Sequence, residues 1–252
     1  MKRSSTVRTG VTAAMGVLSL ALITGCGGGS DDDSKASESP RSSEASASPT
    51  TAAAKALGAA DLEKLLLVQS DLPRDKIADG DGTLPKSRSE LKTDKAACAP
   101  LAYALTGLPP GDTETGASNT VTSEERVGNS FNVTMTSVGL SSYEGDGAAK
   151  ALKAVSDGIA PCSGGFGITA QGEEMKITKV ANGKASGKGD DSVAFVLDAD
   201  MDGEGTGTFT VEAVRVGTVV STYYSVDFAS MESGKTSAVP LAVIDAQVGK
   251  LK

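Results

Sequence analysis

The residue types that carry most enzyme chemistry are sparse in this chain. Among its 252 residues there is no histidine, and the only cysteines are Cys26, Cys98 and Cys162. Histidine is the usual general base and the commonest metal ligand in proteins, and it activates many nucleophiles. The 32 Asp and Glu residues include no recognisable catalytic pair. We therefore predict a protein that is not an enzyme, with no catalytic residue, metal or cofactor. A hydrolase that uses carboxylates alone is the competing enzymatic hypothesis.

One segment resembles a phosphate-binding loop. Residues 229–236 read Ala-Ser-Met-Glu-Ser-Gly-Lys-Thr, between an expected strand and an expected helix. The tight backbone cradle of such a loop favours glycine at its first position, which here is Ala229. The strands around it read as consecutive hairpins, whereas a phosphate-binding loop sits in a βαβ unit. We interpret the segment as a solvated loop.

A second segment opens like a calcium-binding loop. Asp198, Asp200 and Asp202 alternate and are followed by Gly203. The bidentate Glu that should close such a loop at its twelfth position is replaced by Phe209, and the flanking segments read as strands instead of helices. The pattern favours an acidic hairpin turn over a metal site.

Two adjacent tyrosines are the candidate ligand-binding residues. Tyr223 and Tyr224 fall in an expected strand over residues 218–228, and consecutive side chains in a strand point to opposite faces. One of them is therefore expected to line a cleft while the other packs under helices. We favour Tyr223 for the cleft, because its face, shared with Val219 and Ser225, is the more polar.

The N-terminal segment has the pattern of an export signal. It carries Lys2, Arg3 and Arg8 and no acid, followed by an apolar stretch over residues 11–23 that is too short for a typical transmembrane helix. The stretch ends in Leu-Ile-Thr-Gly-Cys at residues 22–26, which resembles the lipobox of bacterial lipoproteins. We predict cleavage before Cys26 and a lipid on that cysteine, which would hold the protein on the extracytoplasmic face of the cell membrane.

The remaining cysteines, Cys98 and Cys162, are the only pair left in an oxidising compartment. A disulfide between them is therefore expected. Two free buried thiols are the alternative.

Composition restricts the partners. The formal net charge of the chain is −8, and removal of residues 1–25 takes away three positive charges and leaves −11. A domain this acidic, without a basic cluster, is poorly suited to nucleic acid. The expected partners are the membrane, through the lipid anchor, and a small ligand or an envelope protein.

The chain divides into three parts. Residues 1–25 form the signal peptide, and residues 26–56 comprise the lipidated cysteine and a tether rich in Gly, Ser, Asp, Ala and Pro. The tether contains no aromatic residue, so it cannot bury enough apolar surface to fold, and as a flexible coil it reaches roughly 30 Å. Residues 57–252 are long enough for one domain.

Apolar periodicity within 57–252 predicts the order of elements. Helices are expected near residues 62–71, 94–106, 146–160 and 240–251, and strands near 117–126, 129–139, 173–181, 192–199, 206–216 and 218–228. Residues 74–92 are charged and Gly-rich and read as a loop. The order predicts an α+β fold: a mostly antiparallel, twisted sheet of about six strands with helices packed on one face.

The domain resembles the PknH-like extracellular sensor domain family, which occurs on actinobacterial receptor kinases and on stand-alone lipoproteins. The resemblance rests on the element order and on short segments: 65–67 with 71–73, the two cysteines Cys98 and Cys162, Gly-Asp-Asp-Ser at 189–192 and Val-Arg-Val-Gly at 214–217. It implies a curved antiparallel sheet with a cleft for an unidentified small ligand. That family typically has two disulfides, whereas this chain can form only one, and it offers no catalytic residue to transfer.

The leading functional hypothesis is therefore a non-enzymatic, ligand-binding or sensor-like domain of a cell-surface lipoprotein. The alternative is a structural or partner-binding envelope lipoprotein with no small-molecule site. A concave pocket lined by apolar and aromatic residues would favour the first hypothesis.

Overall fold

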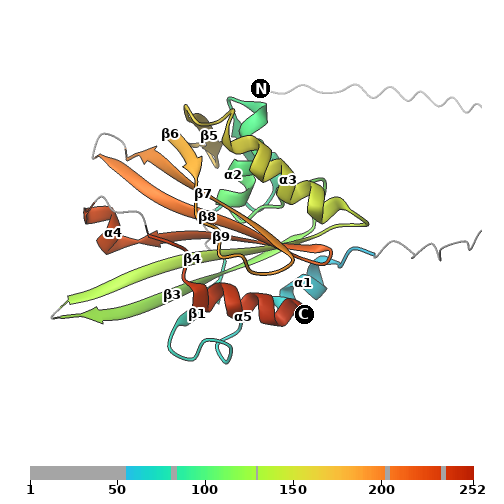
Figure 1. Ribbon diagram of the computed structural model, residues 1–252, viewed down its shortest axis with the longest axis horizontal. Coiled ribbons are helices and arrows are strands. Elements are labelled where there is room, and N and C mark those ends of the chain that lie inside the picture. The colour runs from blue at the N-terminus through green and yellow to red at the C-terminus, as the bar shows by residue number, and fades with distance from the viewer. Residues whose placement is uncertain (1–54, 81–83, 129, 202–204, 234–236) are drawn as a thin grey trace, which may run out of the picture. The chain divides into compact units, whose positions relative to one another are not determined.

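The computed structural model describes residues 55–80, 84–128, 130–201, 205–233 and 237–252. The chain divides after Pro49, and Thr50–Lys252 is one compact unit. This unit contains the whole described sheet (Figure 1). It also contains the disulfide and all the core clusters. The unit therefore has its own hydrophobic core, as a folded domain does.

The strands among the described residues form a single nine-stranded antiparallel sheet in the order β1-β3-β4-β9-β8-β7-β6-β5-β2. Their bounds are β1 Lys76–Asp79, β2 Leu91–Thr93, β3 Gly116–Val127, β4 Ser130–Ser142, β5 Phe166–Ala170, β6 Glu173–Asn182, β7 Asp191–Asp200, β8 Thr206–Val216 and β9 Val219–Asp227. The helices are α1 Ala59–Leu65, α2 Ala99–Leu105, α3 Gly147–Ile159, α4 Phe228–Ser233 and α5 Leu241–Leu251, with short 3-10 turns at Arg88–Glu90 and Ala96–Cys98.

The expected fold class is wrong in its number of strands. β1, β2 and β5 were not predicted; β1 lies within residues 74–92, which read as a loop, and β2 begins within them. β1 and β2 are only four and three residues long and form the two edges of the sheet. β1 and β2 are too short to show an apolar alternation: each has one large apolar side chain, Ile77 in β1 and Leu91 in β2, and each of these packs against a core cluster.

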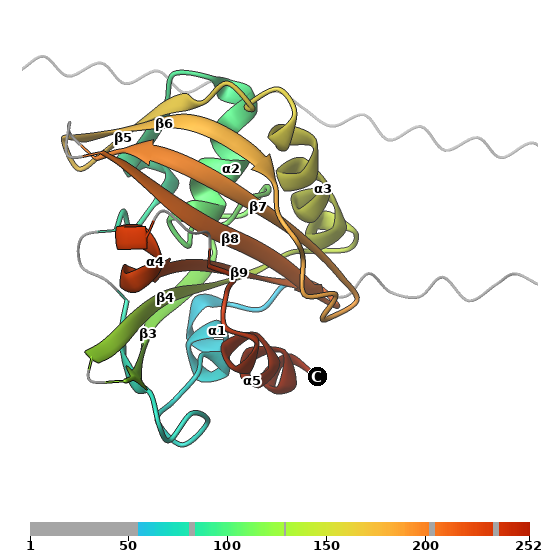
Figure 2. The same ribbon diagram turned by 60° about the vertical axis from the view of Figure 1, so that its left-hand side comes forward.

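The expected placement of helices on one face is also wrong. Tyr223 and Tyr224 are consecutive in β9, so their side chains point to opposite faces of the sheet. Tyr223 packs in a core cluster with Val243 and Ile244 of α5, whereas Tyr224 packs against the cluster that contains Leu101 of α2. Figure 2 shows α2 and α3 on one side of the sheet and α1 and α5 on the other. The central strands are buried on both faces because helices cover both.

Local sequence explains why α3 forms where it does. Its buried residues Ala148, Ala151, Leu152, Val155 and Ile159 recur at helical spacing and face the sheet. The helix leads into Cys162, which is bonded to Cys98 with the two Cα atoms 5.8 Å apart. The expected disulfide is therefore present, and it joins the entry to α2 with the segment after α3 inside one buried cluster.

A close approach between a loop and the sheet fixes the end of α2. Gly139 of β4 lies under the loop after this helix, and a Cβ atom at this position would come within 2.4 Å of the carbonyl oxygen of Gly107. Only glycine allows this contact. The contact positions Thr106, the residue directly after α2, against the middle of the sheet.

Candidate functional site

Tyr223, the tyrosine favoured for a cleft, lies in the core instead. Its side chain is 0% exposed and packs with Val121, Val138 and Ile244. Its hydroxyl donates a hydrogen bond to Oγ of Ser221 at 3.0 Å, and burial raises the pKa of this phenol. The polar face of β9 thus does not mark an uncovered surface, because α5 covers its small polar side chains.

Tyr224 lies on the other face and lines a cavity. Its ring packs against Phe209 of β8, with the ring centroids 5.6 Å apart. Burial raises the pKa of the Tyr224 phenol, and its hydroxyl has no hydrogen-bond partner among the residues that the structure describes. A ligand atom in the cavity could therefore form a hydrogen bond with this hydroxyl.

The Tyr224 cavity has a volume of about 470 Å³, which is within the range of pockets that take small ligands. It lies between the end of α2, the β5–β6 hairpin and the segment that leads into the first 3-10 turn. The residues that line it are Leu84, Pro85, Leu105, Thr106, Ile168, Ala170, Gln171, Glu173, Glu174, Met175 and Tyr224. Three regions that are remote in sequence therefore meet at one strand of the sheet.

The Gln171 side chain closes one side of this cavity. Its amide Nε2 donates a hydrogen bond to the carbonyl oxygen of Leu84 at 3.0 Å. Gln171 has a φ of 53° at the β5–β6 turn, where Gly172 also has a positive φ of 88°. Successive left-handed residues are typical of a tight hairpin turn, and the conformation is strained for glutamine. The turn thus aims the amide at the segment that forms the opposite wall.

The lining of the Tyr224 cavity is mostly apolar and carries negative charge only. Leucine, isoleucine, proline, alanine and methionine side chains supply its walls, and Glu173 and Glu174 are its charged residues. The hydroxyl of Thr106 is already used, because it donates to the carbonyl oxygen of Ala102 at 3.0 Å. The cavity thus offers apolar walls, two carboxylates and the hydroxyl of Tyr224.

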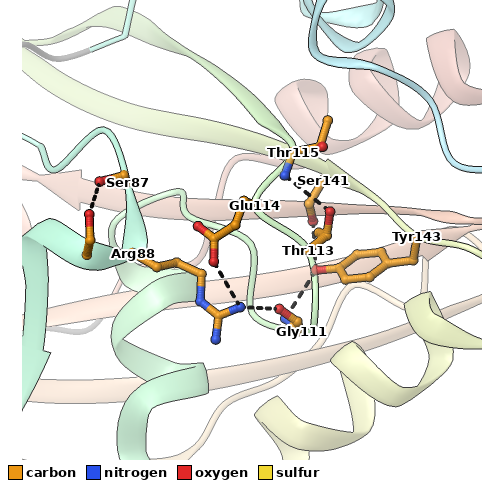
Figure 3. A network of polar contacts seen from close by, with 9 residues as sticks. Ser87, Arg88, Gly111, Thr113, Glu114, Thr115, Ser141 and Tyr143 are labelled. Atoms are coloured by element: carbon orange, nitrogen blue, oxygen red, sulfur yellow. Dashed lines mark hydrogen bonds and ion pairs between the residues drawn. The ribbon is translucent and has the colours of Figure 1, made fainter. Parts of the chain in front are cut away.

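A larger depression of about 700 Å³ lies beside Arg88 and Tyr143, and both of these side chains are engaged by neighbouring residues. Figure 3 shows the Arg88 guanidinium directed at Gly111 and Glu114. Nη1 of Arg88 donates to the carbonyl oxygen of Gly111 at 2.8 Å, and the guanidinium carbon lies 4.5 Å from the ring centroid of Tyr103. These contacts hold the loop after α2 in place. They also occupy the Arg88 guanidinium, which is therefore already paired within the protein.

The phenol of Tyr143 completes this network (Figure 3). Its oxygen accepts hydrogen bonds from the backbone N–H of Gly111 at 3.2 Å and from Oγ of Ser141 at 3.1 Å. Burial raises the pKa of Tyr143. The network joins the loop at Gly111 to the end of β4, so we interpret it as a structural support and not as a ligand site.

One carboxylate is buried on the α5 face. Glu212 of β8 is 3% exposed and lies opposite Tyr223 in the sheet. It accepts hydrogen bonds from the backbone N–H of Ser186, at 2.9 Å, and from the Ser186 hydroxyl. Burial raises the pKa of Glu212. The carboxylate thereby fastens the loop between β6 and β7 to the core.

The structure describes only some of the remaining predicted positions. Cys26 lies outside the described residues, as do 234–236 of the phosphate-loop segment and 202–204 of the calcium-loop segment. In the described part of the latter, Oδ1 of Asp198 accepts a hydrogen bond from the Thr208 hydroxyl at 2.8 Å. The described residues contain no group of three or more His, Cys, Asp or Glu that could hold a metal ion.

The sequence reasoning missed most of the cavity. Leu84 and Pro85 are an apolar pair within a charged, Gly-rich segment, and Met175 is an apolar residue within the charged start of β6. These isolated apolar residues were the available signal. They become a site only through contacts between segments far apart in sequence.

No family model and no curated protein matches the chain. One solved structure, the extracellular domain of PknH from Mycobacterium tuberculosis, resembles it with a TM-score of 0.39 and 14% sequence identity, over 78% of this chain and 95% of that chain. A likeness at this level does not establish a shared fold or function.

Proposed function

We propose that Thr50–Lys252 is a binding domain that holds a small, largely apolar molecule in the Tyr224 cavity without converting it. The observation that carries this proposal is the apolar cavity of about 470 Å³, in whose wall the Tyr224 hydroxyl has no hydrogen-bond partner among the described residues. Ligand sites commonly combine apolar walls with a few polar groups that set orientation. Binding without conversion is supported by the lack of histidine in the chain and by the engagement of Cys98 and Cys162 in a disulfide.

The proposal places the domain outside the cytoplasmic membrane, attached through lipid on Cys26. The export signal and lipobox at residues 1–26 support this location. The disulfide supports it independently, because such bonds persist in oxidising compartments. No helix among the described residues has the length and apolar character needed to cross a membrane.

Two single-tryptophan variants test the binding site. The chain contains no tryptophan, so a residue introduced by mutation is the only indole emitter. Met175→Trp reports from the wall of the Tyr224 cavity, and Met201→Trp is the matched control, because Met201 is similarly exposed but does not line this cavity.

The variants are used after a thermal-shift screen of Thr50–Lys252 against envelope lipids, glycan fragments and metabolites. Compounds that raise the melting temperature should change the emission of Met175→Trp and leave that of Met201→Trp unchanged. A screen without stabilising compounds, or compounds that affect both emitters equally, would remove support for this site.

One observation favours the alternative of a partner-binding lipoprotein. Phe131 near the β3–β4 turn is 64% exposed, and Phe228 at the start of α4 is 46% exposed. The two regions are joined, because Asn132 Nδ2 donates to Oδ2 of Asp227 at 2.9 Å. Exposed aromatic residues are common at protein interfaces. Specific capture of an envelope protein that is lost in Phe131→Ser, with no ligand found for the cavity, would favour this function.

A further inference from the structure

The charge on the cavity wall points to the class of molecule that the Tyr224 cavity accepts. Resting on the proposed function, we infer that the ligand has an aliphatic body and a neutral or cationic polar end, and that Glu173 excludes anionic ligands. The inference follows from which side chains share the cavity face, from the distribution of charge around it and from the unpaired hydroxyl of Tyr224.

The register of the β5–β6 hairpin places Glu173 on the cavity face. Ile168 pairs with Met175 and Ala170 pairs with Glu173, so these four side chains lie on one face of the hairpin. The same face carries Phe166 and Ile177, which belong to the core cluster beneath α2. Glu174 also contributes to the lining, but its side chain alternates to the other face of the hairpin. The carboxylate of Glu173 therefore stands beside the apolar wall formed by Ile168 and Met175.

No positive group balances this carboxylate inside the cavity. The lining contains neither lysine nor arginine, and Glu173 makes no ion pair within the described residues. On the same hairpin and beneath it, Lys176 and Lys95 line an adjoining depression, which shares Ile168, Glu174 and Met175 with the Tyr224 cavity. Arg88 is engaged by Gly111 and Tyr103 in another direction. An anionic ligand would therefore meet a like charge and no partner.

The walls select an aliphatic body. Leu84, Leu105, Ile168 and Met175 present alkyl surface to the cavity, and the one aromatic residue in the lining is Tyr224. Each methylene moved from water into such a wall strengthens binding on the order of fourfold. The hydroxyl of Tyr224 can accept from or donate to an uncharged polar atom of the ligand.

Three probes of equal chain length separate the charge classes: decylamine, decan-1-ol and decanoate. The assay measures how well each probe displaces a neutral fluorescent dye, N-phenyl-1-naphthylamine, from Thr50–Lys252. It is run at neutral pH and below the concentration at which the probes aggregate. We expect decylamine and decan-1-ol to displace the dye about tenfold more effectively than decanoate, which corresponds to about 1.4 kcal/mol.

The variant Glu173→Gln assigns the effect to one carboxylate. It should bring the affinity for decanoate close to that for decan-1-ol. Glu125→Gln removes the same charge from an exposed residue of β3 that does not line the cavity, and it should leave the tenfold difference in place. This control separates the local charge from the net negative charge of the domain.

Two results would overturn the inference while the cavity remains a binding site. The first is decanoate binding as tightly as decylamine, and the second is an equal response of Glu173→Gln and Glu125→Gln. If no decyl compound binds but screened compounds alter the Met175→Trp emission, the ligand class is wrong and the proposed function stands. If neither decyl nor screened compounds act at this site, the proposed function fails as well.

Discussion

The side-chain amide of Gln171 and the main-chain carbonyl of Leu84 are joined by a hydrogen bond of 3.0 Å between residues 87 positions apart. This bond connects the β5–β6 turn to the segment that forms the opposite wall of the Tyr224 cavity. The two walls are thereby held at a fixed separation, although one of them is not part of a regular element.

Gln171→Ala is predicted to loosen the cavity more than the fold. An exposed hydrogen bond contributes roughly 1 kcal/mol, so the melting temperature should fall only slightly. Dye affinity should fall severalfold, because the Leu84 wall is no longer held. Gln171→Gly is the control for backbone strain, since glycine tolerates the positive φ. Equal dye affinity in wild type and both variants would show that the bond does not shape the cavity.

Substitution of the two tyrosines of β9 by phenylalanine should give opposite results. Tyr224→Phe removes only the free hydroxyl, so it should weaken a ligand with an uncharged polar end roughly fivefold and leave stability unchanged. Tyr223→Phe removes the bond to Ser221, so it should lower the free energy of unfolding by about 1 kcal/mol and leave affinity unchanged. Calorimetric titration and chemical denaturation measure the two quantities. The assignment of the site is refuted if Tyr223→Phe affects binding and Tyr224→Phe does not.

Loss of the disulfide should destabilise the domain strongly. The bond closes a loop of 64 positions, for which chain entropy predicts about 4 kcal/mol. A double Cys98→Ala and Cys162→Ala variant should therefore melt roughly 8 to 16 °C below wild type. In the wild-type protein, alkylation after denaturation without reductant should label neither residue. Quantitative labelling of both would contradict the bond.

The buried carboxylate of Glu212 should make stability depend on pH. Its pKa is raised in the folded state, so the unfolded chain ionises first as pH rises. Stability is therefore lost between the unfolded pKa, about 4.3, and the higher folded pKa, by about 1.4 kcal/mol for each unit between them. Glu212→Gln removes the ionisable carboxyl and with it this pH-dependent loss of stability. Its melting temperature, relative to wild type, should increase from pH 4 to neutral pH, and a constant difference would argue against the raised pKa.

Lipid attachment at Cys26 predicts partitioning into detergent. When a lipoprotein-processing host expresses the full chain, the protein should enter the detergent phase of a Triton X-114 separation, because acyl chains bind detergent micelles as they bind membranes. Cys26→Ala should move it to the aqueous phase. Identical partitioning of both forms would rule out the anchor.

The parts of the fold that could be predicted are those whose signal is local. The buried stripe of α3 and the apolar run of Val193–Leu197 in β7 are visible in a few consecutive residues. That run is apolar on both faces, which is typical of a central strand covered on both sides, but only one covered face was predicted. Tyr223 shows why the uncovered face of β9 was predicted wrongly. Ser221 and Ser225 make the Tyr223 face polar, yet both serines are buried. Small hydroxyl side chains pack readily under a helix once their hydrogen bonds are satisfied.

The cavity could not be predicted for a different reason. Its walls come from segments whose proximity is set by the curvature and order of the sheet, and no period in the sequence encodes either. Thr106 reaches the cavity because Gly139 admits the loop after α2, and Leu84 reaches it through Gln171. Such contacts depend on pairs of distant residues that single-segment patterns do not report.

The strands β1 and β2 follow one another in the chain but form opposite edges of the sheet. Neither can pair until a strand made later in synthesis is in place: β1 requires β3, and β2 requires β5. Such long-range pairing slows folding, because loop closure must precede the contacts that compensate for it. The Tyr224 cavity also needs Tyr224 of β9 and the β5–β6 hairpin, so it is completed only after strands made later than the Leu84 segment have paired.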